Sequence, residues 1–222
     1  MRFTSLRLAP LWATLTVSGP SHAAASLLVD DAGTTPDSSC QLESWVRNTP
    51  RHSERTAVPA CTVAGTEWSF ALSHLRGRGD TPWAVGAKRT LRGWHADRIQ
   101  LAGALQTGGD LRHGGAGGWA VNVPLSIGVD RQGEVVVHAN TGWVRSRNER
   151  GLTFGAATEI RIAPRWSVLA EQYRDAAHHR SSQLGIRRLL RNDASLDLLA
   201  GRQHGAASDS WLTVGLNLPL TR

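Results

Sequence analysis

A two-residue alternation of bulky apolar and small or polar side chains runs through most of the 222-residue chain. Between residues 212 and 218 every second residue is Leu or Val, and the residues between them are Thr, Gly and Asn. This period is typical of β-strands and not of helices. The side chains of the small and polar face are too small to fill a core. The face with the bulky side chains must therefore be the one that is buried or that faces lipid. The pattern predicts an all-β, antiparallel transmembrane β-barrel with an apolar outside and a polar lumen. Its main rival is a soluble periplasmic β-protein with the apolar face buried against a second sheet.

The spacing of the alternating stretches predicts twelve strands. They are expected at residues 41 to 48, 55 to 63, 67 to 74, 83 to 94, 98 to 107, 118 to 129, 134 to 145, 151 to 162, 166 to 174, 181 to 190, 194 to 202 and 210 to 218. Every second connection is three or four residues long, and the others have five or more. Short periplasmic turns and longer extracellular loops produce this asymmetry in outer-membrane barrels. Ten strands is the alternative, because the stretch before Glu67 is the least regular.

The N-terminus has the order of a secretory signal peptide. Arg2 and Arg7 precede an apolar core at 8–17, and small residues follow it. Cleavage after Ala23 or after Ala25 fits the small-residue rule. The core is too short for a transmembrane helix. We therefore expect four regions: a signal peptide at 1–25, a short N-terminal segment at 26–39, the barrel at 40–218 and a C-terminal tail at 219–222.

Export, alternation and turn asymmetry together resemble the small outer-membrane β-barrel proteins of Gram-negative bacteria. The resemblance is architectural and covers about residues 67 to 218. It implies location in the outer membrane, with membrane lipid, lipopolysaccharide and the outer-membrane assembly machinery as partners. Seven tryptophans at or near strand ends fit the aromatic girdle of such barrels at the headgroup level. They are Trp68, Trp83, Trp94, Trp119, Trp143, Trp166 and Trp211.

The two cysteines agree with this topology. Cys40 starts the first strand and Cys61 lies near the end of the second, so an antiparallel hairpin brings them opposite each other. Two cysteines in an exported chain predict one disulfide bond.

Charged and polar residues at alternate positions are expected to line the lumen. The set is Glu67, Lys88, Arg98, His138, Asn140, Glu159, Arg161, Glu171, Arg187 and Asp197. In a narrow barrel such residues form a lumen-filling network of ion pairs and hydrogen bonds, because unpaired buried charges are costly. The functional alternative is an aqueous pathway whose charges set selectivity.

Charge restricts the partners of the chain. There are 25 Lys and Arg residues against 18 Asp and Glu, and Lys88 is the only lysine. Guanidinium groups near the longer loops suit the phosphates of lipopolysaccharide. The arginines are scattered instead of forming one stripe, which argues against a nucleic-acid partner. No spacing matches a metal-ligand motif, and no cofactor is expected.

Catalysis has weak support in the sequence. His138 and Asn140 share one face, and Ser126, Thr153 and Ser167 lie on neighbouring strands, but no distinctive motif accompanies them. The favoured function is therefore a porin-like small-solute pathway or a structural membrane component. The alternative is a non-catalytic surface binding or adhesion protein that acts through its extracellular loops, and an outer-membrane hydrolase ranks third. The solute and the oligomeric state are not specified by these patterns.

Overall fold

The computed structural model describes residues 26–77, 79–95, 97–112, 114, 116–146, 149–205 and 208–220. The expected signal peptide, with both cleavage positions, lies outside the described residues, as do residues 221 and 222 of the expected tail. No helix in the described part of the chain has the length and apolarity needed to span a membrane.

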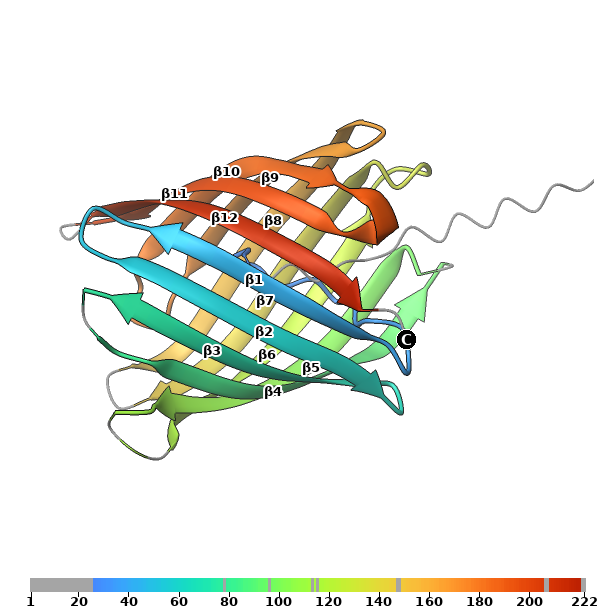
Figure 1. Ribbon diagram of the computed structural model, residues 1–222. Coiled ribbons are helices and arrows are strands. Elements are labelled where there is room, and N and C mark those ends of the chain that lie inside the picture. The colour runs from blue at the N-terminus through green and yellow to red at the C-terminus, as the bar shows by residue number, and fades with distance from the viewer. Residues whose placement is uncertain are drawn as a thin grey trace, which may run out of the picture.

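Twelve antiparallel strands form one closed barrel (Figure 1), which confirms the twelve-strand prediction over the ten-strand one. The strands are β1 (Cys40–Asn48), β2 (Ser53–Val63), β3 (Thr66–Arg76), β4 (Pro82–Trp94), β5 (Ile99–Asp110), β6 (Ala116–Gly128), β7 (Val135–Ser146), β8 (Arg150–Ala163), β9 (Trp166–Arg174), β10 (Arg180–Leu189), β11 (Ser195–His204) and β12 (Asp209–Leu220). A short 3₁₀ turn, η1 (Arg191–Asp193), connects β10 to β11.

The barrel closes where β1 pairs with β12, in a register that runs from Cys40 opposite Leu220 to Asn48 opposite Leu212. β12 therefore extends two residues beyond the expected end at Leu218. Closure satisfies the hydrogen-bonding groups of both terminal strands, which a sheet in a membrane requires because lipid offers no partners.

The alternation of the sequence becomes a division between outside and inside. On β12 the outward Leu212 and Val214 are 59% and 48% exposed, whereas the inward Thr213 and Asn217 are 0% and 4% exposed. Large apolar side chains are exposed on most strands, as expected of a surface that faces lipid. The polar face is the buried one, so the barrel has the inside-out arrangement of an outer-membrane protein.

The turns keep the asymmetry seen in the sequence. Tight turns on the short side contain left-handed residues, among them Gly65 with φ of 72° and Asn192 with φ of 56°. One irregularity lies on β4, where the pairing with β5 shifts between Thr90 and Arg92. At this bulge two consecutive residues, Leu91 and Arg92, face outward. Odd-numbered residues of β4 therefore face outward before the bulge, and even-numbered residues face outward after it.

The disulfide prediction is confirmed. Cys40 and Cys61 are bonded, and they lie directly opposite each other in the β1–β2 pairing. The bond lies at the short-turn end of the barrel, where the chain of residues 26–39 joins β1. Hydrogen bonds from Ser38 N to Thr62 O (2.9 Å) and from Thr62 N to Ser39 O (2.9 Å) continue the pairing beyond it.

Candidate functional site

The lumen is occupied by the chain itself. Residues 26–35, here called the N-terminal segment, lie inside the barrel and contact strands around most of its circumference. Val29 and Ala32 are 1% and 0% exposed, which places them among the most buried residues of the protein. Glycines make room for this close approach. A Cβ on Gly155 would lie 2.9 Å from Val29 Cγ2, and one on Gly215 would lie 2.6 Å from Ser26 Cβ.

Lys88 holds the acidic part of the N-terminal segment. Its Nζ lies 2.8 Å from Asp30 Oδ1 and 3.6 Å from Asp31 Oδ1. Asn140, with its amide oriented so that nitrogen donates, bonds the main chain of Asp30 on both sides: Nδ2 donates to Asp30 O (2.7 Å) and Oδ1 accepts from Asp30 N (2.8 Å). One lysine from β4 and one asparagine from β7 thus fix the same turn of the segment.

Carboxylates of the wall bind the backbone of the N-terminal segment. Glu171 Oε1 accepts hydrogen bonds from the N–H groups of Leu28 and Val29, both at 3.1 Å. Glu67 Oε2 accepts from Thr35 N at 2.8 Å. Backbone donors that would be unsatisfied inside the barrel are therefore paired, as buried N–H groups must be.

A second charged cluster lies beside the start of the segment. Arg187 on β10 bonds Asp197 through two nitrogens, at 2.8 and 2.9 Å, and bonds Glu159 Oε2 through Nη1 at 2.9 Å. Ser26 Oγ donates to Asp197 Oδ2 at 2.7 Å. The pairing of this buried guanidinium with two carboxylates compensates for its removal from water.

Most of the lumen residues named from the sequence meet in these clusters. Those that bond the segment or one another are Glu67, Lys88, Asn140, Glu159, Glu171, Arg187 and Asp197. Two others lie elsewhere. Arg98 is exposed in the β4–β5 turn, where Nη2 donates to the carbonyls of Gly128 and Asp130 at 3.1 Å each. Arg161 is exposed near the short-turn end of β8.

His138 pairs with Ser126 inside the lumen. Its Nδ1 lies 2.8 Å from Ser126 Oγ, and the same oxygen accepts from Ala32 N at 2.8 Å. His138 is 9% exposed and Ser126 is 7% exposed, because the N-terminal segment covers them. The pair therefore belongs to the contacts that hold the segment.

Six of the seven girdle tryptophans lie on outward positions of their strands: Trp68, Trp83, Trp94, Trp119, Trp143 and Trp166. Trp211 differs from the expectation. It lies on the lumen side of β12, where Nε1 donates to Gln183 Oε1 at 2.7 Å and Arg47 stacks over the ring at 5.6 Å. The sequence indicates this placement, because Trp211 is two residues before the inward Thr213 and therefore shares its face.

Several lumen residues lie outside the set expected from the sequence. Gln41, Glu43 and Trp45 lie on the inward face of β1, and Gln41 Nε2 donates to Glu43 Oε1 at 3.2 Å. Asp30 and Asp31 were missed because the segment that carries them has no periodicity. Among the described residues at inward strand positions, acids outnumber bases. The acids are Glu43, Glu54, Glu67, Asp110, Glu159, Glu171, Asp197 and Asp209, and the bases are Arg47, Lys88, Arg161 and Arg187.

Comparison with solved structures shows the same class of fold. The KdgM porin superimposes with a TM-score of 0.67 at 8% identity, covering 82% of this chain and 99% of that one. The NanC porin gives 0.60 at 9% identity, covering 82% and 100%. The COG4313 outer membrane channel from Pseudomonas putida F1 gives 0.54 at 10% identity, covering 86% and 98%. The barrel thus shares the fold of these outer-membrane porins and channels, as the sequence predicted.

Residues 11–220 match the model of a protein family described as uncharacterised conserved protein UCP029691. The chain therefore belongs to that family. No curated protein matches it in sequence.

Proposed function

We propose that this protein is a gated, porin-like pathway for small solutes, closed by its own N-terminal segment. The observation that carries the proposal is the way in which the segment is held. Its contacts with the wall are mainly hydrogen bonds and the ion pairs of Lys88, and Val29 is its one large, deeply buried apolar side chain. Water can replace such polar contacts when the segment leaves, whereas an apolar plug would lose its burial energy outright.

The wall charges suggest which solutes would pass. Departure of the segment would leave Glu43, Glu67 and Glu171 facing the pathway, on a wall that also carries the bases Arg47, Lys88 and Arg187. Rings of carboxylates favour cations. One similar solved structure is the KdgM porin in complex with disordered oligogalacturonate. The acid-rich wall described above favours cationic or neutral solutes in the present barrel.

Replacement of residues 27–35 by a Gly/Ser sequence of equal length tests the gate. The expected result in planar bilayers is a long-lived conductance step that the parent chain shows rarely, with a reversal potential in a salt gradient that indicates cation preference. The companion variant Val29→Cys with Gly155→Cys joins the segment to β8 by a second disulfide. The rare conductance steps of the parent should be absent from it and should return on reduction, with the reduced parent as the control for loss of the Cys40–Cys61 bond. A refolded Gly/Ser variant that stays as silent as the parent would refute the gate.

Export and membrane contacts belong to the same proposal. We infer that residues 1–25 are removed as a signal peptide and that the assembly machinery inserts the barrel in the outer membrane. Outward arginines near the long-loop ends of their strands, such as Arg55, Arg145 and Arg150, support contact with lipopolysaccharide phosphates. Cleavage after Ala25 would place a new ammonium group on Ser26, beside Asp197. N-terminal sequencing of the membrane-inserted protein distinguishes this from cleavage after Ala23.

A further inference from the structure

A polar cluster interrupts the apolar outer face of β9, β10 and β11 near their long-loop ends. The pairing of the three strands places its members in two adjacent rows of three. The rows are Gln172, Ser182 and Arg202, and Arg174, Arg180 and His204. All six occupy outward positions, on the faces that carry Leu184 and Leu198 lower down. The nearby end of the strands places this cluster at the headgroup boundary, where polar side chains cost little compared with the bilayer centre.

Ser182 forms a hydrogen bond with a histidine, as a serine nucleophile does with its general base. Its Oγ lies 2.7 Å from His204 Nε2. Gln172 Nε2 donates to the same oxygen at 2.6 Å. Because the glutamine supplies the donor in its bond, the serine hydroxyl hydrogen is free to point at the imidazole nitrogen. A serine that donates to a neutral histidine is the arrangement needed for activation by general base catalysis.

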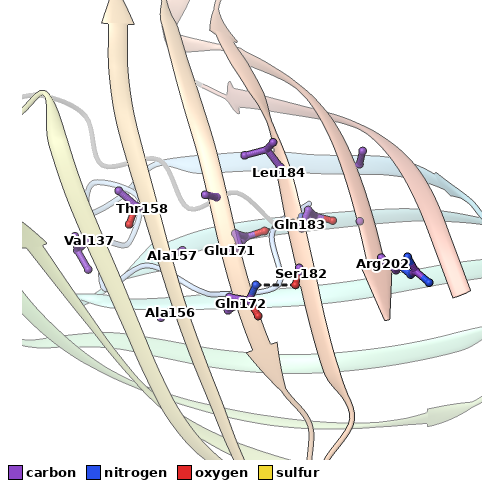
Figure 2. Close-up of a pocket in the computed structure, with 13 residues that line it drawn as sticks. Val137, Ala156, Ala157, Thr158, Glu171, Gln172, Ser182, Gln183, Leu184 and Arg202 are labelled. Atoms are coloured by element: carbon purple, nitrogen blue, oxygen red, sulfur yellow. Dashed lines mark hydrogen bonds between the residues drawn. The ribbon is translucent and has the colours of Figure 1, made fainter. Parts of the chain in front are cut away.

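An outward-facing groove of about 640 Å³ adjoins this pair. Figure 2 shows its lining on the neighbouring strands, with Gln172 and Ser182 joined by the dashed hydrogen bond and Arg202 on the next strand. The small outward side chains Ala156, Ala170 and Ala200 leave the hollow. A mainly apolar trough that faces lipid and has a serine in its lining has the polarity to hold a single acyl chain.

Three arginines lie in the same two rows as the serine. Arg174, Arg180 and Arg202 are exposed, and within the described residues none of them forms an ion pair with a carboxylate. Arg174 Nη2 lies 3.0 Å from His178 Nδ1. Guanidinium groups at the membrane boundary suit the phosphates of lipid headgroups. The cluster thus combines a phosphate-binding element, an activated hydroxyl and an acyl groove.

We propose that Ser182 and His204 form a hydrolytic site on the lipid-facing surface, for the acyl ester of a phosphate-bearing membrane lipid. Ser182 Oγ attacks the ester carbonyl carbon and its proton passes to His204 Nε2. Gln172 Nε2 donates to the oxyanion that develops. The carbon–oxygen bond to the lipid alcohol then breaks, and His204 protonates the departing oxygen. Water attacks the acyl-serine with His204 again taking the proton, which releases a fatty acid and restores the serine hydroxyl.

This site is separate from the lumen described above. Ser126 and His138 lie under the N-terminal segment, whereas Ser182 and His204 face outward on other strands. A hydrolytic activity would therefore not require the pathway to open, and loss of the serine should leave conductance unchanged.

Acyl release by the refolded full barrel tests the proposal. Phosphatidylglycerol in mixed micelles is one substrate and purified lipopolysaccharide is the other, with released fatty acid measured by mass spectrometry. Ser182→Ala and His204→Gln should reduce release by about 10³-fold, as expected when a nucleophile or its base is removed. Ser181→Ala, one residue away on the lumen face, is the matched control and should retain full activity. A fluorophosphonate probe should label the parent chain at Ser182.

Heat-shifted migration on SDS gels first establishes that each variant is folded. Release from the phospholipid alone identifies a glycerophospholipid ester as the substrate, and release from lipopolysaccharide alone identifies a lipid A ester. Either result supports the site if Ser182→Ala abolishes it. Absence of release from both lipids by the parent chain, or equal release by Ser182→Ala and Ser181→Ala, would overturn the proposal.

Discussion

Replacement of Lys88 by methionine should open the lumen. Lys88 is the cation that faces Asp30 and Asp31, at 2.8 and 3.6 Å. Methionine keeps most of the side-chain volume and removes the charge. Two carboxylates of the N-terminal segment would then lie without their cation in a lumen whose wall also carries Glu43 and Glu67, and Glu67 already binds the same segment.

The size of the effect follows from the burial of the pair. Breaking a buried ion pair by removing one partner costs about 3 to 5 kcal/mol. The Asp30 side chain is 37% exposed, although those of Lys88 and Asp31 are only 10% and 8% exposed, so the lower end of the range applies. About 3 kcal/mol shifts the ratio of closed to open barrels by roughly 10²-fold, since 1.4 kcal/mol corresponds to a factor of ten.

Single-channel recording in planar bilayers measures this shift as the fraction of time spent conducting. Arg89→Met is the control, because Arg89 is the neighbouring cation on the outer face of the same strand and lies 3.4 Å from Thr66 Oγ1. The role of the Lys88 ion pairs is refuted if Lys88→Met conducts no more than Arg89→Met while the Gly/Ser replacement of the segment conducts freely. In that case the ion pair would not be what holds the segment.

Two further predictions concern the wall. Arg187→Met should lower the free energy of unfolding in urea by about 3 to 5 kcal/mol, because it leaves Asp197 and Glu159 without their shared cation. The control Arg188→Met, on the outer face, should lower it by under about 1 kcal/mol. Brominated lipid quenches the fluorescence of tryptophans that it contacts. Trp68→Phe should therefore reduce the quenchable part of the fluorescence, whereas Trp211→Phe should reduce the part that is not quenched. Equal quenching of the two tryptophans would contradict their placement on opposite faces of the wall.

The strands and their faces could be predicted because both are local properties. Side chains of a strand alternate between its two sides whatever the strand pairs with, so the lumen positions of Glu171 and Arg187 could be read from parity alone. The same parity places Trp211 inside, and the girdle prediction for that residue is wrong because a position near a strand end does not decide which face the side chain occupies. The disulfide was predictable since the hairpin places Cys40 opposite Cys61.

The bulge on β4 could not be predicted from the local sequence. Arg89 and Arg92 interrupt an apolar face, and nothing in the alternation says how the backbone accommodates them. The shift between Thr90 and Arg92 is a feature of the pairing of β4 with β5, and the alternation within β4 alone does not specify it.

The sequence by itself determined the strand count, the inside and outside of the wall, and the covalent link at its short-turn end, because these depend on residues close together in the chain. The content of the lumen was decided only by tertiary structure. Residues 26–35 have no periodicity, and their place depends on partners as distant as Glu67 and Glu171, which only closure of the barrel brings around them. The outer-face pair of Ser182 and His204 likewise exists only through the register of β10 and β11, since no spacing along the chain predicts which serine meets which histidine.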